Sequence, residues 1–238
     1  MKFRRIKAVF KKQIMNMSQN GGILMQFFLY PVITGVMVLV QPVDAVFAKV
    51  SLVMTMATMF TGMMPIMTVN SIISEDKWGN SLRMLIMSTV KPPEYLIGIT
   101  AYILFVSLVS SLVFGLIGGF GGFALLLFVG IIMSGIITTL ILGSAMAIQG
   151  ARKAGTGTLI TIVSLLNGIL PVLGMSNQAI ANISKFWYTQ QIRELMGDLY
   201  GNYFGNLWYR FIIIGANFVV FLILFMISYK SNRFYGEK

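Results

Sequence analysis

Six apolar runs constrain this chain more than any other feature. A run of about 20 apolar residues crosses the hydrocarbon core of a bilayer as a helix, because lipid offers backbone groups no hydrogen-bonding partner. The 238 residues are 57% hydrophobic and only 11% charged, far more apolar than a soluble domain of this length. We therefore expect an all-α polytopic membrane protein with six transmembrane helices. The runs are 21–40, 50–73, 96–118, 123–148, 158–175 and 211–229.

The first twenty residues, MKFRRIKAVFKKQIMNMSQN, predict an amphipathic helix. Basic residues separate apolar ones that recur every three or four positions, which places the two kinds on different faces. We expect residues 1–20 to form an interfacial helix at the inner membrane surface, followed by a six-span domain over 21–238. The alternative is a segment that only orients the first span. The apolar positions are Phe3, Ile6, Phe10, Ile14 and Met17.

The distribution of charge predicts the orientation. With six spans and the N-terminus inside, the cytoplasmic segments hold fourteen of the 18 Lys and Arg residues, as the positive-inside rule requires. We therefore expect a multi-pass protein of the cell membrane with both termini cytoplasmic. The net charge of +11 then reflects membrane orientation and not nucleic-acid binding.

Composition also argues against several kinds of chemistry. The sequence has no cysteine and no histidine, which removes thiol chemistry, disulfides and most transition-metal sites. Intramembrane Asp, Glu, Lys or Arg, which proton- or ion-coupled carriers use, are missing from all six runs. We expect no catalytic residue and no metal ligand.

The segment SEDKWGNSLRMLIMSTVKPPEYLIG lies between the second and third runs, on the cytoplasmic side. Ser74 is a suitable N-cap, and Glu75 and Asp76 carry the charge that a helix N-terminus favours. Pro92 and Pro93 would end the helix. The sequence thus predicts a short helix over about 74–91 that projects into the cytoplasm. Its apolar face would carry Trp78, Leu82, Leu85 and Ile86.

This segment resembles the corresponding loop of the ABC-2 type transporter permeases. In that family an acidic pair, a glycine four residues after the first acid, a leucine-rich helix and a proline precede the third span. The resemblance implies a six-span, type V exporter-like architecture and a coupling helix that docks on a separate nucleotide-binding ATPase subunit. The alternative is an ordinary interfacial helix that tethers two spans. The positions matching the family are Glu75, Asp76, Gly79 and Leu82, and we add Trp78 and Leu85 from the same helix.

A phosphate-binding loop of the type G-x-x-x-x-G-K-[ST] is missing from the chain. GARKAGTGT, starting at Gly150, has both glycines at the right spacing but Thr156 in place of the lysine. We therefore expect a transport subunit that is not itself an enzyme and binds no cofactor, with ATP and Mg²⁺ on the partner. Arg152 and Lys153 in this second cytoplasmic turn either contact the same ATPase or only signal topology.

Residues 176–210 are too polar to span a membrane and are rich in aromatic residues, which prefer the headgroup level. The segment resembles the short outer helices between the fifth and sixth spans of the same family. We expect an outer lid, or alternatively an interfacial anchor without a role in transport. Two helical faces are expected, one with Ile180, Ile183 and Trp187 and one with Ile192, Leu195, Met196 and Leu199.

The same resemblance implies a dimer with a second permease copy, identical or related, and a cargo path between the second and fifth spans near the dimer axis. Flexible methionine side chains could line a path for irregular apolar cargo, although such a stripe also suits helix packing or lipid contact. The expected path residues are Met56, Met59, Met63, Asn167 and Ile169.

The resulting hypothesis is a permease subunit that exports a small apolar or amphipathic molecule, such as a peptide, an antimicrobial or a drug. Two alternatives stay open. One is export of a lipid-linked glycan, and the other is a non-transporting membrane anchor or immunity subunit.

Overall fold

The computed structural model describes residues 3–19, 21–78, 87, 91–150, 156–201 and 207–231. These residues form helices joined by turns, without a strand in the ranges given. The helices are α1 (Phe3–Gln19), α2 (Gly21–Val40), α3 (Val46–Trp78), α5 (Pro92–Ile117), α6 (Gly122–Gly150), α7 (Thr156–Ser176), α8 (Gln178–Ser184), α9 (Tyr188–Gly201) and α10 (Leu207–Ser231).

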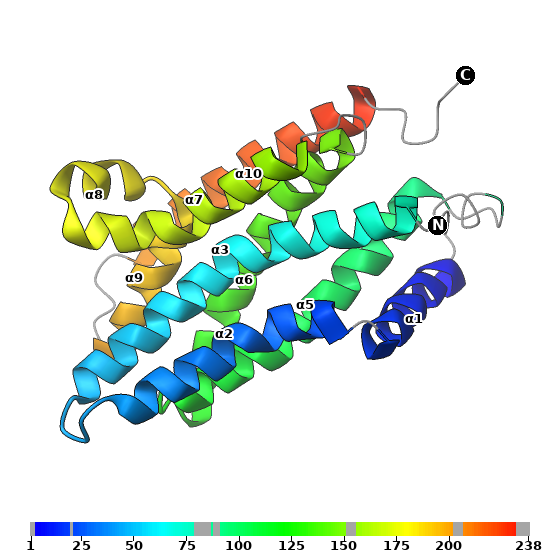
Figure 1. The fold of residues 1–238 in the computed structure, drawn as a ribbon. Coiled ribbons are helices and arrows are strands. Elements are labelled where there is room, and N and C mark those ends of the chain that lie inside the picture. The colour runs from blue at the N-terminus through cyan, green and yellow to red at the C-terminus, as the bar shows by residue number, and fades with distance from the viewer. Residues whose placement is uncertain are drawn as a thin grey trace.

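Six of these helices run alternately up and down one common axis, as Figure 1 shows for α2, α3, α5, α6, α7 and α10. Five of them, α3, α5, α6, α7 and α10, are long and apolar enough to cross a membrane. The prediction of an all-α membrane protein is confirmed. The helix α2 covers the predicted 21–40 span, with its apolar stretch at Phe27–Val40. A sixth crossing stays a prediction.

The long helix α3 is the centre of the bundle. It packs against α2, α5, α6, α7 and α9, and most of its apolar stretch is buried inside the protein. Phe60 of α3 contacts the rings of Phe27, Tyr30 and Phe114, which fixes α2 and α5 against it. Met54, Met63 and Met64 of α3 are buried in the same interior, where they contribute to close packing.

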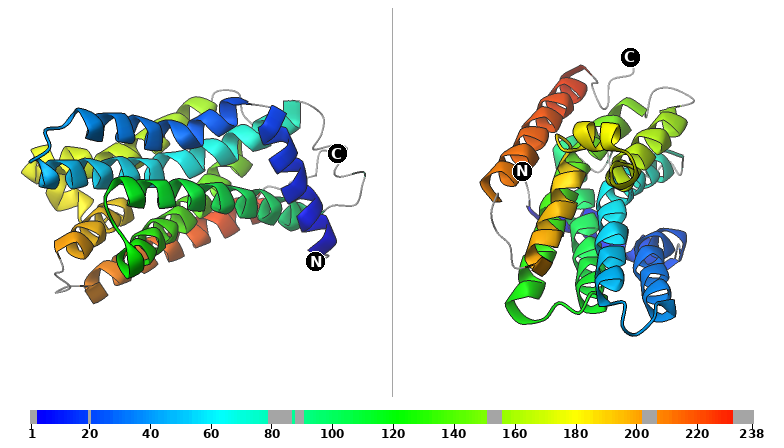
Figure 2. Two further views of the ribbon diagram at one scale, coloured as in Figure 1. Left: turned by 90° about the horizontal axis from the view of Figure 1, so that it is seen from below. Right: turned by 90° about the vertical axis from the view of Figure 1, so that its left-hand side faces the viewer.

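The helix α1 crosses one end of the bundle at a steep angle to the spans (Figure 2, left view). We call this end the α1 end and the opposite one the α9 end. Val9 is buried against Gly98 of α5, where a Cβ atom would lie 2.7 Å from the Val9 side chain. Phe3 and Ile14 of the predicted apolar face stay exposed, by 80% and 40%. The structure thus has a helix over Phe3–Gln19, with Val9 and Phe10 packed on the protein and Phe3 and Ile14 exposed, and its position at a membrane surface stays a prediction.

One predicted helix start is wrong. Ser74 was expected to cap a new helix, but α3 continues without interruption from Val46 to Trp78, so Ser74 lies inside it. Residues favoured at an N-cap are also tolerated inside a helix, and no Pro or Gly between Asn70 and Trp78 interrupts this one. The rest of the predicted coupling helix, from Gly79 onward, lies almost entirely outside the described residues.

The segment expected to form an outer lid contains α8 and α9. The short helix α8 folds back along the end of α7, and α9 packs among α3, α6, α7 and α10 (Figure 1). The predicted face of Ile192, Leu195, Met196 and Leu199 is confirmed as buried. Instead of lying flat across the spans, α9 enters the bundle, because its buried side carries both these apolar residues and polar groups that find partners inside.

Candidate functional site

The α1 end holds a buried carboxylate with three donors. Asp76, 3% exposed near the end of α3, accepts hydrogen bonds from Lys12 Nζ at 2.5 Å, Gln13 Nε2 at 3.3 Å and Tyr95 Oη at 2.7 Å. Lys12 and Gln13 belong to α1 and Tyr95 to α5. We call these four residues the Asp76 junction. Because a buried carboxylate is stable only when it is paired and hydrogen-bonded, the junction fixes three helices relative to one another.

A second acid secures the start of α5. Glu94, 1% exposed, accepts a hydrogen bond from the backbone N–H of Lys91 at 3.1 Å and lies 3.5 Å from Arg5 Nη1 of α1. A carboxylate in the first helical turn also suits the positive end of the helix dipole. The end of α3 and the start of α5, which enclose the predicted coupling segment, are therefore both held by α1.

The two neighbouring acids of the predicted coupling set have different surroundings. Glu75 is exposed and accepts a hydrogen bond from the Ser71 hydroxyl at 3.4 Å, whereas Asp76 is buried in the junction. The other predicted coupling positions, including the side chain of Trp78, lie outside the described part of the chain. These are Trp78, Gly79, Leu82, Leu85, Arg152 and Lys153.

A neutral polar network occupies the middle of the bundle. Asn167 of α7, 2% exposed, donates through Nδ2 to the carbonyl of Gly62 at 2.9 Å and to Tyr188 Oη, and accepts from Trp187 Nε1 at 2.5 Å. The hydroxyls of Tyr188 and Thr139 lie 2.7 Å apart. We call these five residues the Asn167 network. It joins α3, α6 and α7 to Trp187 and Tyr188 at the start of α9.

The helices α3 and α7 approach closely where the network lies. A Cβ atom on Gly62 would lie 2.8 Å from the backbone oxygen of Asn167, and one on Gly168 would overlap the side chain of Met63. Small residues allow such a close backbone approach between membrane helices. At this level the space between α3 and α7 within one copy is filled by protein.

The structure brings together only part of the expected cargo path. Met63 is buried beside Gly168, next to Asn167, whereas Met56, Met59 and Ile169 are half-buried. Asn167, expected to line the path, forms its hydrogen bonds with Gly62 of α3 and with Trp187 and Tyr188. A role of these residues in transport stays a prediction.

An ionic cluster lies between α9 and α10. Arg210 Nη1 is 2.5 Å from Glu194 Oε2, and Arg210 Nε is 3.0 Å from Asp198 Oδ2. Burial raises the pKa of the Asp198 carboxyl above its ordinary value, while the guanidinium of Arg210 lowers it. This cluster holds the start of α10 against α9.

Several of these residues were not predicted from sequence. Lys12, Gln13 and Tyr95 join Asp76 from positions 64, 63 and 19 residues away in the chain. A signal existed for Asp76 itself: it follows the buried Ile72 and Ile73 by one helical turn, which places it on the inward face of α3.

Comparison with protein-family models and with curated proteins finds no match for this chain.

Proposed function

We propose that this chain is the membrane-spanning permease subunit of an exporter driven by ATP hydrolysis in a separate subunit. The observation that carries the proposal is the Asp76 junction. It anchors the end of α3 and, with Glu94, the start of α5, which enclose the loop similar to the ABC-2 coupling segment. A segment held at both ends transmits a push from a docked partner into two helices of the bundle.

The same junction supports a mechanism of coupling. A displacement of the loop would move α3 and α5 together, because Asp76 of α3 and Tyr95 of α5 share a hydrogen bond of 2.7 Å. Since α3 contacts α2, α6, α7 and α9, the movement would reach most of the bundle. Energy from ATP hydrolysis in the partner would enter the membrane domain by this route.

Orientation and assembly belong to the same proposal. The α1 end, with its basic helix, faces the cytoplasm of the cell, in line with the positive-inside rule. The apolar stretches of α7 and α10 are only 28% and 22% buried in one copy, which leaves surface for lipid and for a second permease copy. The cargo is a small apolar or amphipathic molecule, and its path includes the interface between the two copies.

The experiment is recovery of the partner. The chain is purified from native membranes in mild detergent, and co-purifying proteins are identified by mass spectrometry. We expect a subunit with a phosphate-binding loop. Trp78→Ala or Leu82→Asp should lower its recovery at least tenfold, because loss of an anchor at the centre of an interface costs about 2 kcal/mol or more.

Val43→Asp is the matched control, since Val43 is 84% exposed in the turn between α2 and α3 at the opposite end. It introduces the same carboxylate and should leave recovery unchanged. Hydrolysis by the recovered complex should rise when cargo is added. A partner that binds equally well to all variants, or a complex whose hydrolysis ignores every apolar cargo tested, would contradict the proposal and favour an anchoring role.

A further inference from the structure

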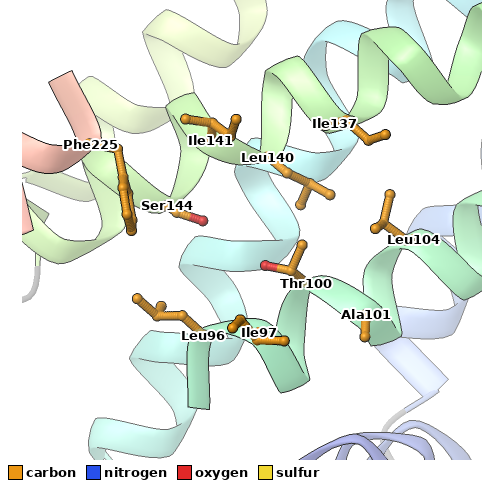
Figure 3. Close-up of a pocket in the computed structure, with 10 residues that line it drawn as sticks. All are labelled: Leu96, Ile97, Thr100, Ala101, Leu104, Ile137, Leu140, Ile141, Ser144 and Phe225. Atoms are coloured by element: carbon orange, nitrogen blue, oxygen red, sulfur yellow. The ribbon is translucent and has the colours of Figure 1, made fainter. Parts of the chain in front are cut away.

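A cavity of about 290 Å³ lies between α5, α6 and α10 (Figure 3). We call it the α5–α6–α10 groove. It is separate from the Asp76 junction and from the Asn167 network and shares no residue with either. Its walls are almost entirely apolar, as expected for a site that binds a hydrocarbon chain. The lining residues are Leu96, Ile97, Thr100, Ala101, Leu104, Ile137, Leu140, Ile141, Ser144 and Phe225.

The groove opens sideways from the bundle. Ile97 and Ile137 at its rim are 43% and 42% exposed, whereas Leu96 and Leu140 in its wall are 6% and 2% exposed. In a bilayer, the surface around Ile97 and Ile137 faces hydrocarbon, because α5 and α6 are both long enough to span. The material that reaches this groove most directly is therefore lipid.

Two hydroxyls face into this apolar space. The side chains of Thr100 and Ser144 lie on opposite walls with their oxygens toward the cavity (Figure 3). Several serines and threonines of the described spans bond to a carbonyl in their own helix, as Thr58 and Thr138 do, and this satisfies a hydroxyl group within a membrane. Thr100 and Ser144 make no hydrogen bond to any described residue. They are available to a ligand that carries an acceptor on an apolar body.

Basic residues lie at the α1 end of the groove. Lys91 precedes α5 and is exposed, roughly 9 Å along the helix from Ile97. Lys230 in the last turn of α10 is also exposed, roughly 8 Å along the helix from Phe225. The ring of Tyr229 stacks on Phe225, with 6.1 Å between the ring centroids. A ligand with its apolar part in the groove would have its polar end near positive charge.

We propose that the α5–α6–α10 groove binds an anionic phospholipid from the leaflet at the α1 end. One acyl chain lies along the apolar walls, an ester carbonyl accepts a hydrogen bond from Thr100 or Ser144, and the phosphate lies near Lys91 and Lys230. The charge of the lysines selects an anionic headgroup. A helix of a second copy fits less well, because close helix approach favours small residues and the rim here carries isoleucines. The proposal needs only insertion in a bilayer and is independent of the ATPase partner.

The test is native mass spectrometry of the full chain, stripped of lipid by detergent exchange and then mixed with equal amounts of palmitoyl-oleoyl phosphatidylglycerol and phosphatidylcholine. We expect the first bound lipid to be mainly phosphatidylglycerol. Each lysine should contribute about fivefold to this preference, so Lys91→Gln with Lys230→Gln should abolish it while acyl binding continues.

Two substitutions at one position separate groove filling from hydroxyl loss. Thr100→Phe should displace the first lipid of either headgroup, and the nearly isosteric Thr100→Val should weaken it by about two- to tenfold. Thr161→Phe is the matched control, because Thr161 lies on an exposed face of α7 and bonds within its own helix. Lys49→Gln with Lys185→Gln, at the α9 end, is the control for charge.

Each outcome is decisive. Loss of the first lipid in Thr100→Phe but not in Thr161→Phe, with the thermal unfolding of both unchanged, supports the acyl site. Equal lipid binding by wild type, Thr100→Phe and Thr100→Val would overturn it. A phosphatidylglycerol preference that survives removal of Lys91 and Lys230, or disappears with Lys49 and Lys185, would overturn the headgroup assignment.

Discussion

The Asp76 junction and the Asn167 network both satisfy buried polar groups, but with different chemistry. At the α1 end the partners are charged, and Lys12 keeps a quarter of its side chain exposed while Asp76 is buried. In the middle of the bundle the partners are an amide, two hydroxyls, an indole and a backbone carbonyl. Desolvating an ion costs several kcal/mol, whereas neutral hydrogen bonds between membrane helices cost far less to bury.

The depth of a buried polar group in the bundle thus determines whether it is paired by a charged or by a neutral partner. Near water, an ion pair holds α1 against the bundle. In the hydrocarbon region, neutral polar groups join helices that already pack closely. The ionic cluster of Arg210 with Glu194 and Asp198 between α9 and α10 follows the same rule, since Glu194 is 34% exposed. Substitutions in the two regions should therefore lower the free energy of unfolding by different amounts.

The largest effect is expected at the junction. Asp76→Ala leaves Lys12, Gln13 and Tyr95 without their acceptor, and breaking a buried pair by removing one partner costs about 3–5 kcal/mol. We expect a loss near the lower limit, because Lys12 is partly solvated. The free energy of unfolding in mild detergent, from a denaturant titration, measures it. The chain has no native cysteine, so a Val9→Cys substitution introduces a single thiol, which is buried and should not react with a thiol reagent. In the Asp76→Ala background this thiol should become reactive, because α1 detaches.

The neighbouring Glu75→Ala is the control for charge and helix propensity. Glu75 is exposed, so its removal should change the free energy of unfolding by no more than about 0.5 kcal/mol. Equal losses for the two acids would mean that Asp76 is not buried at a junction.

An intermediate effect is expected where α3 and α7 cross. Gly62→Ala places a methyl group 2.8 Å from a backbone oxygen of α7, so the helices must separate, at a cost of about 1–3 kcal/mol. Gly215→Ala in α10, which meets nothing within 4 Å, is the matched control and should be stabilising by about 0.5–1 kcal/mol. If both substitutions raise thermal stability in detergent alike, the close crossing does not exist.

The smallest effect is expected in the neutral network. Asn167→Leu should cost about 0.6–2 kcal/mol, and Tyr188→Phe about 1 kcal/mol. Because Asn167 and Tyr188 bond to each other, the double variant should lose less than the sum of the single losses. Strict additivity in unfolding titrations would argue that the two side chains act independently. If a transport assay shows a changed cargo preference for Asn167→Leu without loss of stability, Asn167 would be assigned to the cargo path.

The sequence predicted the positions of the apolar helices well, because a long apolar run favours a helix. The observed bounds of α5 and α6 differ from the expected runs by only a few residues at each end. What failed was the start at Ser74, since a capping residue followed by acids also occurs inside a helix. Counting the helical phase onward from Ile72 and Ile73 would have distinguished Asp76 from Glu75.

The partners inside the bundle were beyond prediction. Tyr188 meets Thr139 and Asn167 across 49 and 21 residues of sequence, and only the packing of α9 between other helices creates these contacts. Periodicity identified the apolar face of α9 correctly, but the polar residues on the same helix favoured a position at the membrane surface. The bundle overrides this preference because it supplies hydrogen-bonding partners at depth.

The position of α1 has a consequence for the time course of synthesis. Arg5 precedes its partner Glu94 by 89 residues, and Lys12 precedes Asp76 by 64. At about 5–20 residues per second, a ribosome needs roughly 4–18 seconds to make the first interval. During this interval α5 does not yet exist, so Val9 has no protein surface to pack against. The apolar side chains of Phe3 and Ile14 can already contact lipid. The membrane surface would thus hold α1 until α5 has been synthesised and packs against it.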